Sequence, residues 1–197
     1  MPASSRSIYF ATGNEGKVLE ARFVLQPLGI RVKPFSGKDL EIQADIEQVA
    51  SYSAASAARR YHRSLIVEDA GLFVESLDGF PGAFSSYVFK TIGVEGLLTL
   101  LQDKKSRRAY FRSAVAYCDP ERRPRIFRGE VAGTISRSPS GDNGFGFDPV
   151  FVPSGGGRTM GELTVSEKCA ISHRGKALRK FAAWFNGRER PSSTRRE

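Results

Sequence analysis

The segment from Leu65 to Gly71 places the strongest single constraint on how this chain can fold. Three large apolar residues, Leu65 to Val67, run directly into Glu68 and Asp69, and Gly71 follows closely. A continuous apolar run that ends at turn-forming residues is typical of a short strand buried on both faces of a sheet. Side chains alternate along a strand, so the two carboxylates are expected on opposite faces, and only one of them leads at a given site.

The position of these two acids predicts a functional site as well as a fold. Ligands of open α/β sheets bind beyond the carboxyl ends of the strands, which is where the predicted strand delivers Glu68 and Asp69. Carboxylates in such a place can hold Mg²⁺ or activate a water molecule. A solvated turn after a strand explains the same residues equally well. Other segments have to decide between these two interpretations.

The length and composition of the chain describe an ordinary single domain. The 197 residues are 40% hydrophobic and 26% charged, which suffices for one sizeable core. We expect residues 1–187 to form that domain and residues 188–197 to form a basic, disordered tail. No run of about eighteen apolar residues occurs, so no membrane span is expected. The two cysteines, Cys118 and Cys169, make neither a metal cluster nor a disulfide framework, so the default expectation is a cytoplasmic protein.

The net charge of +9 indicates an anionic partner without identifying it. Nucleic acid, a membrane surface and a polyphosphate would all fit. Charge alone therefore decides nothing.

Residues Thr12 to Lys17 have the layout of a phosphate-binding turn. Ser7–Thr12 predicts a strand, a glycine-containing turn follows, and a helix with Lys17 in its first turn runs to about Leu28. Backbone N–H groups at a helix N-terminus attract anions, and Lys17 adds a full charge. The spacing of a P-loop is absent, and an ordinary helix start capped by Asn14 is the competing interpretation. The predicted buried stripe of this helix is Val18, Ala21, Leu25 and Leu28.

The middle of the chain predicts a helix, an aromatic cluster and a hairpin. Asp45 opens a helix to about Tyr61 that is rich in small residues. A shorter helix is expected over Glu95–Leu101. Two strand-like segments, Arg108–Cys118 and Arg125–Ile135, read as an antiparallel hairpin. We expect three aromatic residues to lie in the core rather than on an association surface: Phe84, Tyr87 and Phe89. We expect the arginines at the hairpin tip to be solvated, because no aromatic residues are interleaved with them: Arg122, Arg123 and Arg125.

Two segments of the C-terminal third contain candidate ligand contacts. In Gly141–Pro149, glycines between two phenylalanines allow a backbone that presents rings to a flat ligand, and Asp148 offers an acceptor beside them. A glycine-rich turn with two core rings is the plain alternative. Ser172 is expected to cap a final helix that ends at Gly187, with His173 and Arg174 as donors at its start. Zinc and a Ser–His–Asp hydrolase are disfavoured, because the required ligands and nucleophile elbow are missing.

Five motifs occur in order across nearly the whole chain, and together they resemble one family. They are Thr12–Lys17, Glu68–Leu72, Phe80–Gly82, Gly144–Pro149 and Ser172–Arg174. Each motif is weak by itself, but all five in register are specific. The chain thus resembles the inosine triphosphate pyrophosphatase family, also called Ham1-like or non-canonical purine nucleoside triphosphate pyrophosphatases.

The resemblance implies both a fold and a reaction. The implied fold is mixed α/β, with a long curved central sheet flanked by helices and an active-site cleft between two lobes, usually in a homodimer. The implied reaction is Mg²⁺-dependent hydrolysis of ITP, dITP or XTP to the monophosphate and pyrophosphate, which cleanses the nucleotide pool. No membrane and no specific nucleic acid are expected as partners.

The resemblance also implies roles for individual residues. Glu41 and Asp69 would hold the metal, and Asp69 would also be the general base. The phosphates would be held by Thr12, Gly13, Asn14, Glu15, Gly16 and Lys17. The remaining substrate-binding residues, chiefly around the base, would be Ala70, Phe145, Gly146, Phe147, Asp148, Lys168, His173 and Arg174.

This chain departs from the family pattern at two positions. Many relatives carry Ser or Thr where this chain has Ala70, so one hydroxyl contact is lost. Many also carry a lysine in the second helix where this chain has Ser53, and Arg59 or Arg60 is a candidate substitute. Both departures bear on the strength of substrate binding rather than on the type of reaction.

Two other functions compete with this interpretation. A Maf-like pyrophosphatase acting on modified pyrimidine or methylated nucleotides is disfavoured, because Phe145–Asp148 and Ser172–Arg174 match the purine-selective family. A non-enzymatic nucleic-acid binder would use the net charge, but it leaves Glu41, Glu68 and Asp69 without a purpose.

Overall fold

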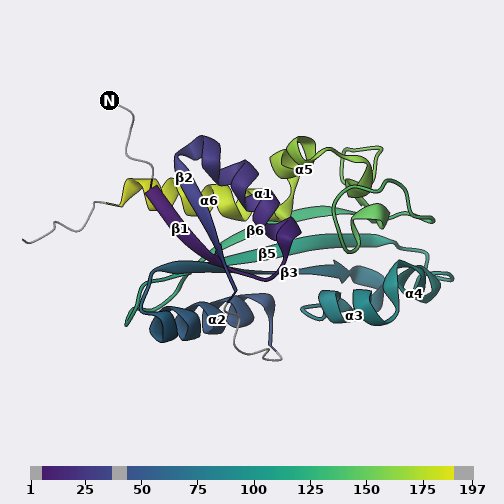
Figure 1. Cartoon of the computed structure of the whole chain (residues 1–197). Helices are drawn as coiled ribbons and strands as arrows, with labels where there is room; N and C mark the ends of the chain where they lie inside the picture. The colour runs from purple at the N-terminus through teal and green to yellow at the C-terminus, as the bar shows by residue number, and fades with distance from the viewer. Residues whose placement is uncertain (1–5, 37–43, 189–197) are drawn as a thin grey trace, which may run out of the picture.

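One long sheet runs through the protein, and helices pack on both of its faces (Figure 1). The structure, a computed structural model, describes residues 6–36 and 44–188. Within these ranges the sheet has seven strands, in the order β2-β1-β3-β5-β6-β7 with β4 paired to β3. The strands are β1 (Arg6–Ala11), β2 (Ile30–Phe35), β3 (Leu65–Val74), β4 (Pro81–Gly82), β5 (Arg108–Cys118), β6 (Arg125–Ile135) and β7 (Phe151–Pro153). The α-helices are α1 (Glu15–Leu25), α2 (Ile46–Tyr61), α3 (Ser85–Thr91), α4 (Gly93–Leu100), α5 (Val165–Ile171) and α6 (His173–Gly187).

Three long antiparallel strands form the middle of the sheet, and short strands extend it at both ends. β3 pairs with β5 along its whole length, from Leu65↔Cys118 to Val74↔Ala109. β1 and β2 run parallel to β3 at the end where β3 begins, whereas β4 and β7 join at the opposite end. The expected mixed α/β fold with a central sheet flanked by helices is confirmed, as is the β5–β6 hairpin with the predicted bounds.

The strand expected at Leu65–Val67 is longer than predicted. β3 continues through Glu68 and Asp69 to Val74, so the two acids lie in the middle of a strand and not beyond its end. The expectation that the acids follow the end of the strand was wrong, and so was the alternative of a solvated turn, because pairing with β5 holds the polar residues in extended conformation. The alternation of side chains is confirmed. Glu68 shares the face of Ile66, which packs with α1 and α6, and Asp69 shares the face of Val67, which packs with α2.

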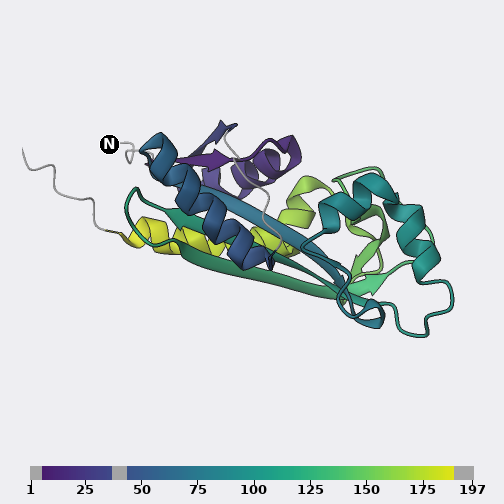
Figure 2. The same cartoon turned by 90° about the horizontal axis from the view of Figure 1, so that it is seen from below.

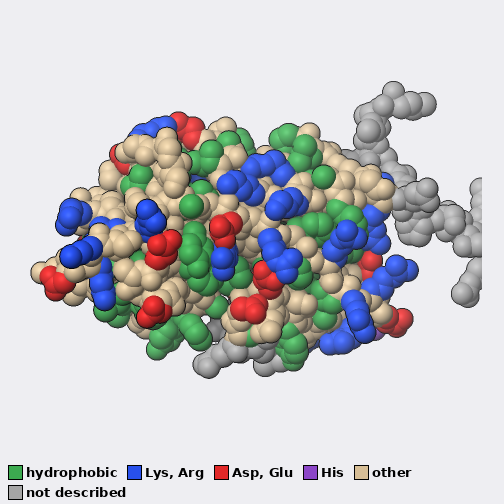
Figure 3. All heavy atoms as spheres, turned by 180° about the vertical axis from the view of Figure 1, so that it is seen from behind, with side chains coloured by type: hydrophobic (Ala, Val, Ile, Leu, Met, Phe, Trp, Pro, Cys, Tyr) green, Lys and Arg blue, Asp and Glu red, His purple; other side chains and the backbone are tan. Residues whose placement is uncertain are grey.

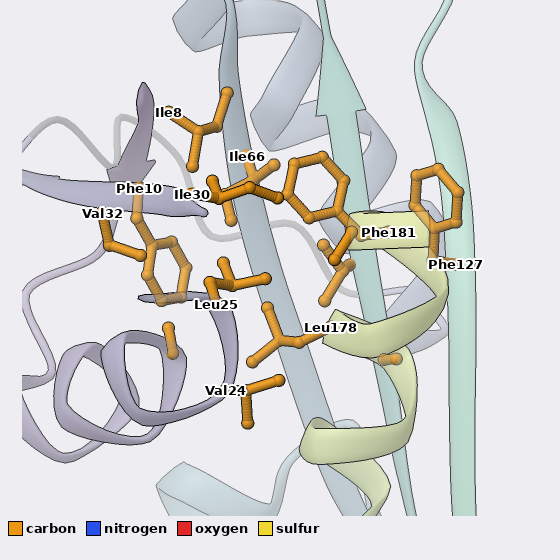
Figure 4. Close-up of a cluster of buried hydrophobic side chains, with 14 of the residues drawn as sticks. Ile8, Phe10, Val24, Leu25, Ile30, Val32, Ile66, Phe127, Leu178 and Phe181 are labelled. Carbon is orange, nitrogen blue, oxygen red and sulfur yellow. The ribbon is translucent and has the colours of Figure 1, made fainter. Parts of the chain in front are cut away.

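Helices cover the two faces of the sheet separately. α1, α5 and α6 lie on one face and α2 lies on the other (Figures 1 and 2). Figure 4 shows the core beneath α1 and α6, where Leu25, Leu178 and Phe181 lie beside Phe10 and Ile66. α2 packs closely through its small residues, as its composition predicted; the buried ones include Ala50, Ala54, Ala57 and Ala58. No helix of the described residues is long and apolar enough to cross a membrane.

A third cluster of buried residues fills the far end of the sheet, around α3, α4 and β7. α3, which the sequence did not predict, is fixed to β3 because the Ser85 hydroxyl accepts from Leu72 N at 2.7 Å and donates to Gly82 O at 2.6 Å. α3 buries only Ser85 and Val88. The prediction that the nearby aromatic residues belong to the core was wrong: Phe84, Tyr87 and Phe89 are 47%, 68% and 39% exposed.

Side-chain caps explain where the principal helices begin. Asp45 accepts from the backbone of Glu47 and Gln48 at the start of α2, and Ser172 accepts from Gly175 N at the start of α6. α1 ends earlier than predicted, because Pro27 follows and the chain continues as a short 3₁₀ turn. Leu28 is consequently 42% exposed and does not belong to the buried stripe. The short helix α5 was also not predicted.

Gly129 of β6 allows α6 to begin directly on the sheet. A Cβ at this position would lie 1.9 Å from His173 O and 2.7 Å from Ala177 N, so any side chain would push the helix away. This close approach brings His173 and Arg174 down toward the middle of β3.

Candidate functional site

The middle of β3 has an open edge on the side of β1. Pairing with β1 ends at Phe10↔Ile66, and pairing with β4 begins at Leu72↔Gly82. Between these points, residues 67–71 have no strand neighbour on that side within the described part of the chain. The backbone carbonyl of Glu68 there accepts from Lys17 Nζ at 3.0 Å instead. This edge, with two carboxylates and a lysine, is the candidate site.

Side-chain hydrogen bonds hold the turn before α1, which presents the helix N-terminus to this edge. Asn14 N donates to Thr12 Oγ1 at 3.1 Å, and Asn14 Oδ1 accepts from Lys17 N at 3.0 Å. Asn14 therefore caps the helix, as the competing interpretation held. Glu15, Gly16 and Lys17 form the first turn, where the helix dipole favours negative charge. The cap and an anion site are compatible uses of the same turn.

Glu68 is buried, and its charge is compensated from two sides. Its Oε2 lies 2.9 Å from Lys17 Nζ, while its Oε1 accepts from Ser113 Oγ at 2.6 Å and lies 3.1 Å from Arg174 Nε. Burial by itself raises the pKa of this carboxyl, but the charges of Arg174 and Lys17 outweigh burial and hold the pKa far below its ordinary value. Glu68 is thus a fixed anion and not a base for a substrate.

The ion pairs continue deeper into the protein through Glu20 of α1. Arg174 Nη1 donates to Glu20 Oε2 at 2.8 Å, and Lys168 Nζ donates to Glu20 Oε1 at 2.7 Å and to Asp148 Oδ2 at 2.6 Å. These four residues and Glu68 are each at most 4% exposed. We refer to six residues with three positive and three negative charges as the ion-pair network: Lys17, Glu20, Glu68, Asp148, Lys168 and Arg174.

The acids of the network differ in how well their charges are compensated. Burial raises the pKa of Glu20, but Arg174 and Lys168 outweigh it, and the pKa falls below its ordinary value. For Asp148 burial outweighs the attraction of Lys168, so its pKa is raised. Asp148 is therefore the network carboxyl that is protonated most easily. The Arg174 guanidinium stays charged, because Glu68 and Glu20 outweigh burial, which favours the neutral form, and raise its pKa.

The loop of residues 144–148 places one aromatic ring against the network. Phe145 N donates to Asp148 Oδ2 at 2.7 Å, and its ring centroid lies 4.8 Å from Lys168 Nζ and 5.2 Å from Arg174 Cζ. Gly16 is required beside this ring, because a Cβ there would lie 2.6 Å from Phe145 Cδ1. Gly144 is required as well, since it has a positive φ and a Cβ would lie 2.3 Å from Asp148 Oδ2.

The predicted substrate-binding residues of this loop separate into two groups. Phe145 and Asp148 reach the network, and Gly146 adopts a positive φ of 65° between the two rings. Phe147 is instead buried in the far-end core, where its ring packs edge-on against Phe89 at 5.5 Å. The structure thus brings one of the two phenylalanines to the candidate site.

His173 lies beside the network as a buried neutral imidazole. Its ring stacks on Phe111 at 4.7 Å, with an angle of 13° between the planes. Burial, reinforced by the charge of Arg174, holds its pKa well below the ordinary value. Its Nδ1 is buried without a hydrogen-bond partner among the described residues, which leaves one polar atom available to a ligand.

Asp69 and Ala70 lie half-buried at the same open edge, and Asp69 is on the α2 face. Glu41, the other predicted metal ligand, lies outside the described residues. In the described ranges no group of three or more His, Cys, Asp or Glu side chains is placed to hold a metal ion. Mg²⁺ commonly binds through one or two carboxylates together with substrate phosphates, so a single carboxylate at this edge fits that mode. Ser53 is buried in α2 and does not present its hydroxyl to solvent.

Three residues that hold the site together were missed by the sequence analysis. Glu20 follows an exposed position in α1, and an isolated glutamate in a helix carries no signal that it is buried. Ser113 and Phe111 lie on a strand whose partners become known only once the register of β5 on β3 is known. The nearest sequence signal was the position of Glu20 one residue before Ala21, on the edge of the predicted apolar stripe.

A sequence model of the Ham1 family matches residues 8–184, which is most of the chain. The chain belongs to the Ham1 family. This confirms the resemblance drawn from the five motifs, and the Maf-like interpretation is not retained.

Relatives in this family are similar over nearly their whole length. The chain is 49% identical over 179 residues to a dITP/XTP pyrophosphatase of Methanopyrus kandleri, covering 90% of this chain and 95% of the relative. It is 52% identical over 177 residues to one of Thermococcus kodakarensis, covering 89% and 95%. Among solved structures, a HAM1 protein from Coxiella burnetii aligns with a TM-score of 0.83 and 32% identity, covering 93% of this chain and 100% of that one.

Replacing Glu20 by glutamine is expected to destabilise the Ham1 fold strongly. Lys168 and Arg174 would keep their buried charges but lose a shared carboxylate, and breaking a buried ion pair in this way costs about 3–5 kcal/mol of unfolding free energy. Urea unfolding followed by the fluorescence of Trp184 measures the change. Glu15→Gln, at an exposed position of the same helix, is the matched control. A loss for Glu20→Gln as small as that of the control would contradict the role of the network.

Acidification is expected to destabilise the protein through His173. The unfolded chain takes up a proton at this residue below about pH 6.5, whereas the folded protein resists it, so the unfolding free energy falls as the pH falls through that value, by up to about 1.4 kcal/mol per pH unit. His173→Phe keeps a ring on Phe111 and should flatten the pH dependence between pH 7 and 5.5 in urea unfolding. His62→Asn, at the exposed end of α2, should retain the wild-type slope. Equal slopes for wild type and His173→Phe would refute the assignment.

Proposed function

We propose that this chain is a Mg²⁺-dependent nucleoside triphosphate pyrophosphatase that hydrolyses dITP, XTP and ITP to the monophosphate and pyrophosphate. The observation that carries the proposal is the open edge of β3, where a helix N-terminus, Lys17 and Asp69 converge beside a buried donor network. Relatives about half identical to this chain are named dITP/XTP pyrophosphatases, and a solved structure from Mycobacterium abscessus with that name aligns with a TM-score of 0.69 and 34% identity, covering 89% of this chain and 97% of that one.

The first turn of α1 would hold the phosphates. Its backbone N–H groups and helix dipole supply positive potential, and Lys17 supplies a charge that Glu68 orients at 2.9 Å. As water attacks the α-phosphorus, negative charge develops on the phosphate oxygens, and donors fixed in advance stabilise that charge without reorganising.

Recognition of the base would come from the network side of β3. Hypoxanthine and xanthine present a carbonyl at C6 and an N–H at position 1. Donors from His173 and Arg174 suit the carbonyl, the Asp148 carboxylate suits the N–H, and the Phe145 ring offers a stacking surface. Adenine would place an amino group against those donors, and leaving such buried groups unpaired costs roughly 1–3 kcal/mol.

Asp69 would act as the general base and as a metal ligand, with Glu41 as the second ligand. When bound, Mg²⁺ would supply positive charge to the phosphate oxygens. Asp69 is suited to contact a water there because it lies half-buried at the open edge. Glu68 is fully buried and is held by Lys17, Arg174 and Ser113. The cleft between two lobes remains part of this proposal.

The proposal includes a homodimer that forms through the α3–α4 face. Six large hydrophobic side chains between residues 80 and 100 are 39–68% exposed: Phe80, Phe84, Tyr87, Phe89, Ile92 and Leu100. Clustered apolar exposure of this kind is typical of an interface between subunits.

The free state of Cys118 and Cys169 supports a reducing, cytoplasmic compartment.

Release of pyrophosphate from dITP, XTP, ITP, GTP, ATP and dTTP, with and without Mg²⁺, tests the reaction. The wild-type protein should prefer dITP and XTP over ATP by at least about tenfold, and only when metal is present. Asp69→Asn should lower kcat by roughly 10²- to 10⁴-fold, since it removes the general base. Asp78→Asn, at an exposed position with positive φ that asparagine accepts, should leave kcat unchanged. A folded Asp69→Asn variant with most of its activity would exclude Asp69 as the base.

Light scattering after size-exclusion chromatography tests the dimer. The wild-type protein should elute with twice the chain mass, and Tyr87→Glu should shift it to the monomer by placing a charge in the interface. Phe23→Glu, which alters an exposed aromatic residue of α1, is the control and should remain dimeric. A monomeric wild type, or dissociation by both changes, would disprove this interface.

A further inference from the structure

One end of the protein brings together three segments that are far apart in the sequence. Asp119, at the tip of the β5–β6 hairpin, accepts from Ser64 Oγ at 2.6 Å and from the Tyr117 hydroxyl, and it pairs with Arg188 Nη2 at 3.0 Å. Ser64 follows α2, and Arg188 follows α6. The end of α2, the hairpin tip and the end of α6 therefore form one continuous surface around Asp119.

This surface is built mainly from arginine. We call its basic residues the arginine end: Arg6, Arg59, Arg60, Arg63, Arg122, Arg123, Arg125 and Arg188. The same segments, residues 59–64, 117–125 and 185–188, contain two acids, Asp119 and Glu121. Figure 3, which views the molecule from behind, shows Lys and Arg side chains gathered at its right-hand end. The charge at this end is thus strongly positive.

Most arginines of the arginine end have no acidic partner. Exposed arginines elsewhere in the described ranges are of both kinds: Arg112, Arg128 and Arg158 pair with Glu130, Glu47 and Glu167, whereas Arg22, Arg108 and Arg137 form no ion pair. Within residues 6–36 and 44–188, five exposed members of the arginine end form no ion pair: Arg59, Arg63, Arg122, Arg123 and Arg125. This surface leaves its positive charge available.

Aromatic rings from distant segments hold several of these guanidinium groups in place. Arg125 Cζ lies 4.9 Å from the ring centroid of Trp184, and Arg63 Cζ lies 4.6 Å from that of Tyr9. Arg188 Cζ lies 4.8 Å from Trp184. The hairpin tip lacks aromatics in its own sequence, but the fold supplies them from α6 and β1. A stacked guanidinium keeps its plane fixed while its N–H groups stay available for bidentate contacts with phosphate.

We propose that the arginine end binds the phosphate backbone of nucleic acid without reading its sequence. Fixed guanidinium forks match phosphate oxygens, and unpaired positive charge gains most from a polymer that carries one negative charge per nucleotide. The rings beneath the arginines are covered by the guanidinium groups, so they offer no open platform on which bases could stack. Binding is therefore directed to the backbone.

The surface fits nucleic acid better than an anionic membrane. Membrane-surface binding combines basic residues with exposed apolar side chains that enter the lipid. The large hydrophobic side chains that are exposed lie on α1, α2, α3, α4 and α5 and in the turns next to α1 and α3; within the described residues, none belongs to the segments of the arginine end. This binding does not depend on the proposed reaction.

Fluorescence anisotropy with a labelled, mixed-sequence RNA single strand of about 20 nucleotides tests the proposal over a series of salt concentrations. The wild-type protein should bind at low salt and lose affinity steeply as salt rises. Changing Arg122, Arg123 and Arg125 together to glutamine should weaken binding at low salt by at least about tenfold and reduce the log–log salt slope by about 2, because three phosphate contacts contribute roughly 0.7 each.

The matched control removes the same charge at the other end of β5. Lys104, Lys105 and Arg108 are all exposed, and their joint change to glutamine should alter affinity by less than about twofold and leave the slope unchanged. The double variant Arg122→Gln with Arg123→Gln keeps the stacked Arg125 and so controls for a folding defect caused by its loss. It should reduce the slope by about 1.4. Thermal melting confirms that each variant is folded.

Several results would overturn the proposal. One is the absence of RNA binding by the wild-type protein at low salt, and another is an equal loss from both triple variants, which would indicate diffuse charge only. Sedimentation with phosphatidylserine vesicles but no binding to RNA would identify a membrane surface instead. A fall in kcat/KM for nucleotide hydrolysis with unchanged RNA binding would assign these arginines to attracting the substrate.

Discussion

The buried contact between Glu20 and the pair Lys168 and Arg174 is the interaction on which the rest of the site depends. It joins α1, near the N-terminus, to α5 and α6, near the C-terminus, with hydrogen bonds of 2.7 and 2.8 Å. A buried ion contributes to stability only when its partners are present, because otherwise its desolvation is uncompensated. The six charges of the network therefore behave as a unit, and through them α1, β3, the loop of Phe145 and the start of α6 take fixed relative positions.

This constraint shapes how an anion can be bound. Lys17 and Arg174 are already paired with Glu68, so the site is not a collection of unpartnered cations that attracts any phosphate. A nucleotide gains most of its binding free energy from the first turn of α1 and from Lys17, which also pairs with Glu68. Its base binds to donors that are held in place and still have hydrogen-bonding capacity. Selectivity then follows from fixed directions of hydrogen bonds more than from total charge.

The sequence predicted what depends on local patterns. Helix caps at Asn14, Asp45 and Ser172 and the two strands of the hairpin are encoded by neighbours, and they appear where expected. The length of β3 was missed, because its acids are held in extended conformation by β5, more than forty residues away. Glu20 and Phe111 were missed for the same reason: their importance lies in partners that only the tertiary fold brings near. The exposed aromatics near α3 were misjudged because hydrophobicity does not reveal which face a short helix turns outward.

The distribution of charge separates two uses of arginine in one protein. Arg174 is buried, paired on two sides and locked in its charged state, so its charge acts inside the site. Arg122 and Arg123 are exposed and unpaired within the described ranges, so their charge acts outward. The network is neutral as a whole, and hence the net charge of +9 does not come from the network. Positive charge that lies outside the reaction site does not disturb the catalytic geometry. Surface substitutions can therefore change this charge while the network stays intact.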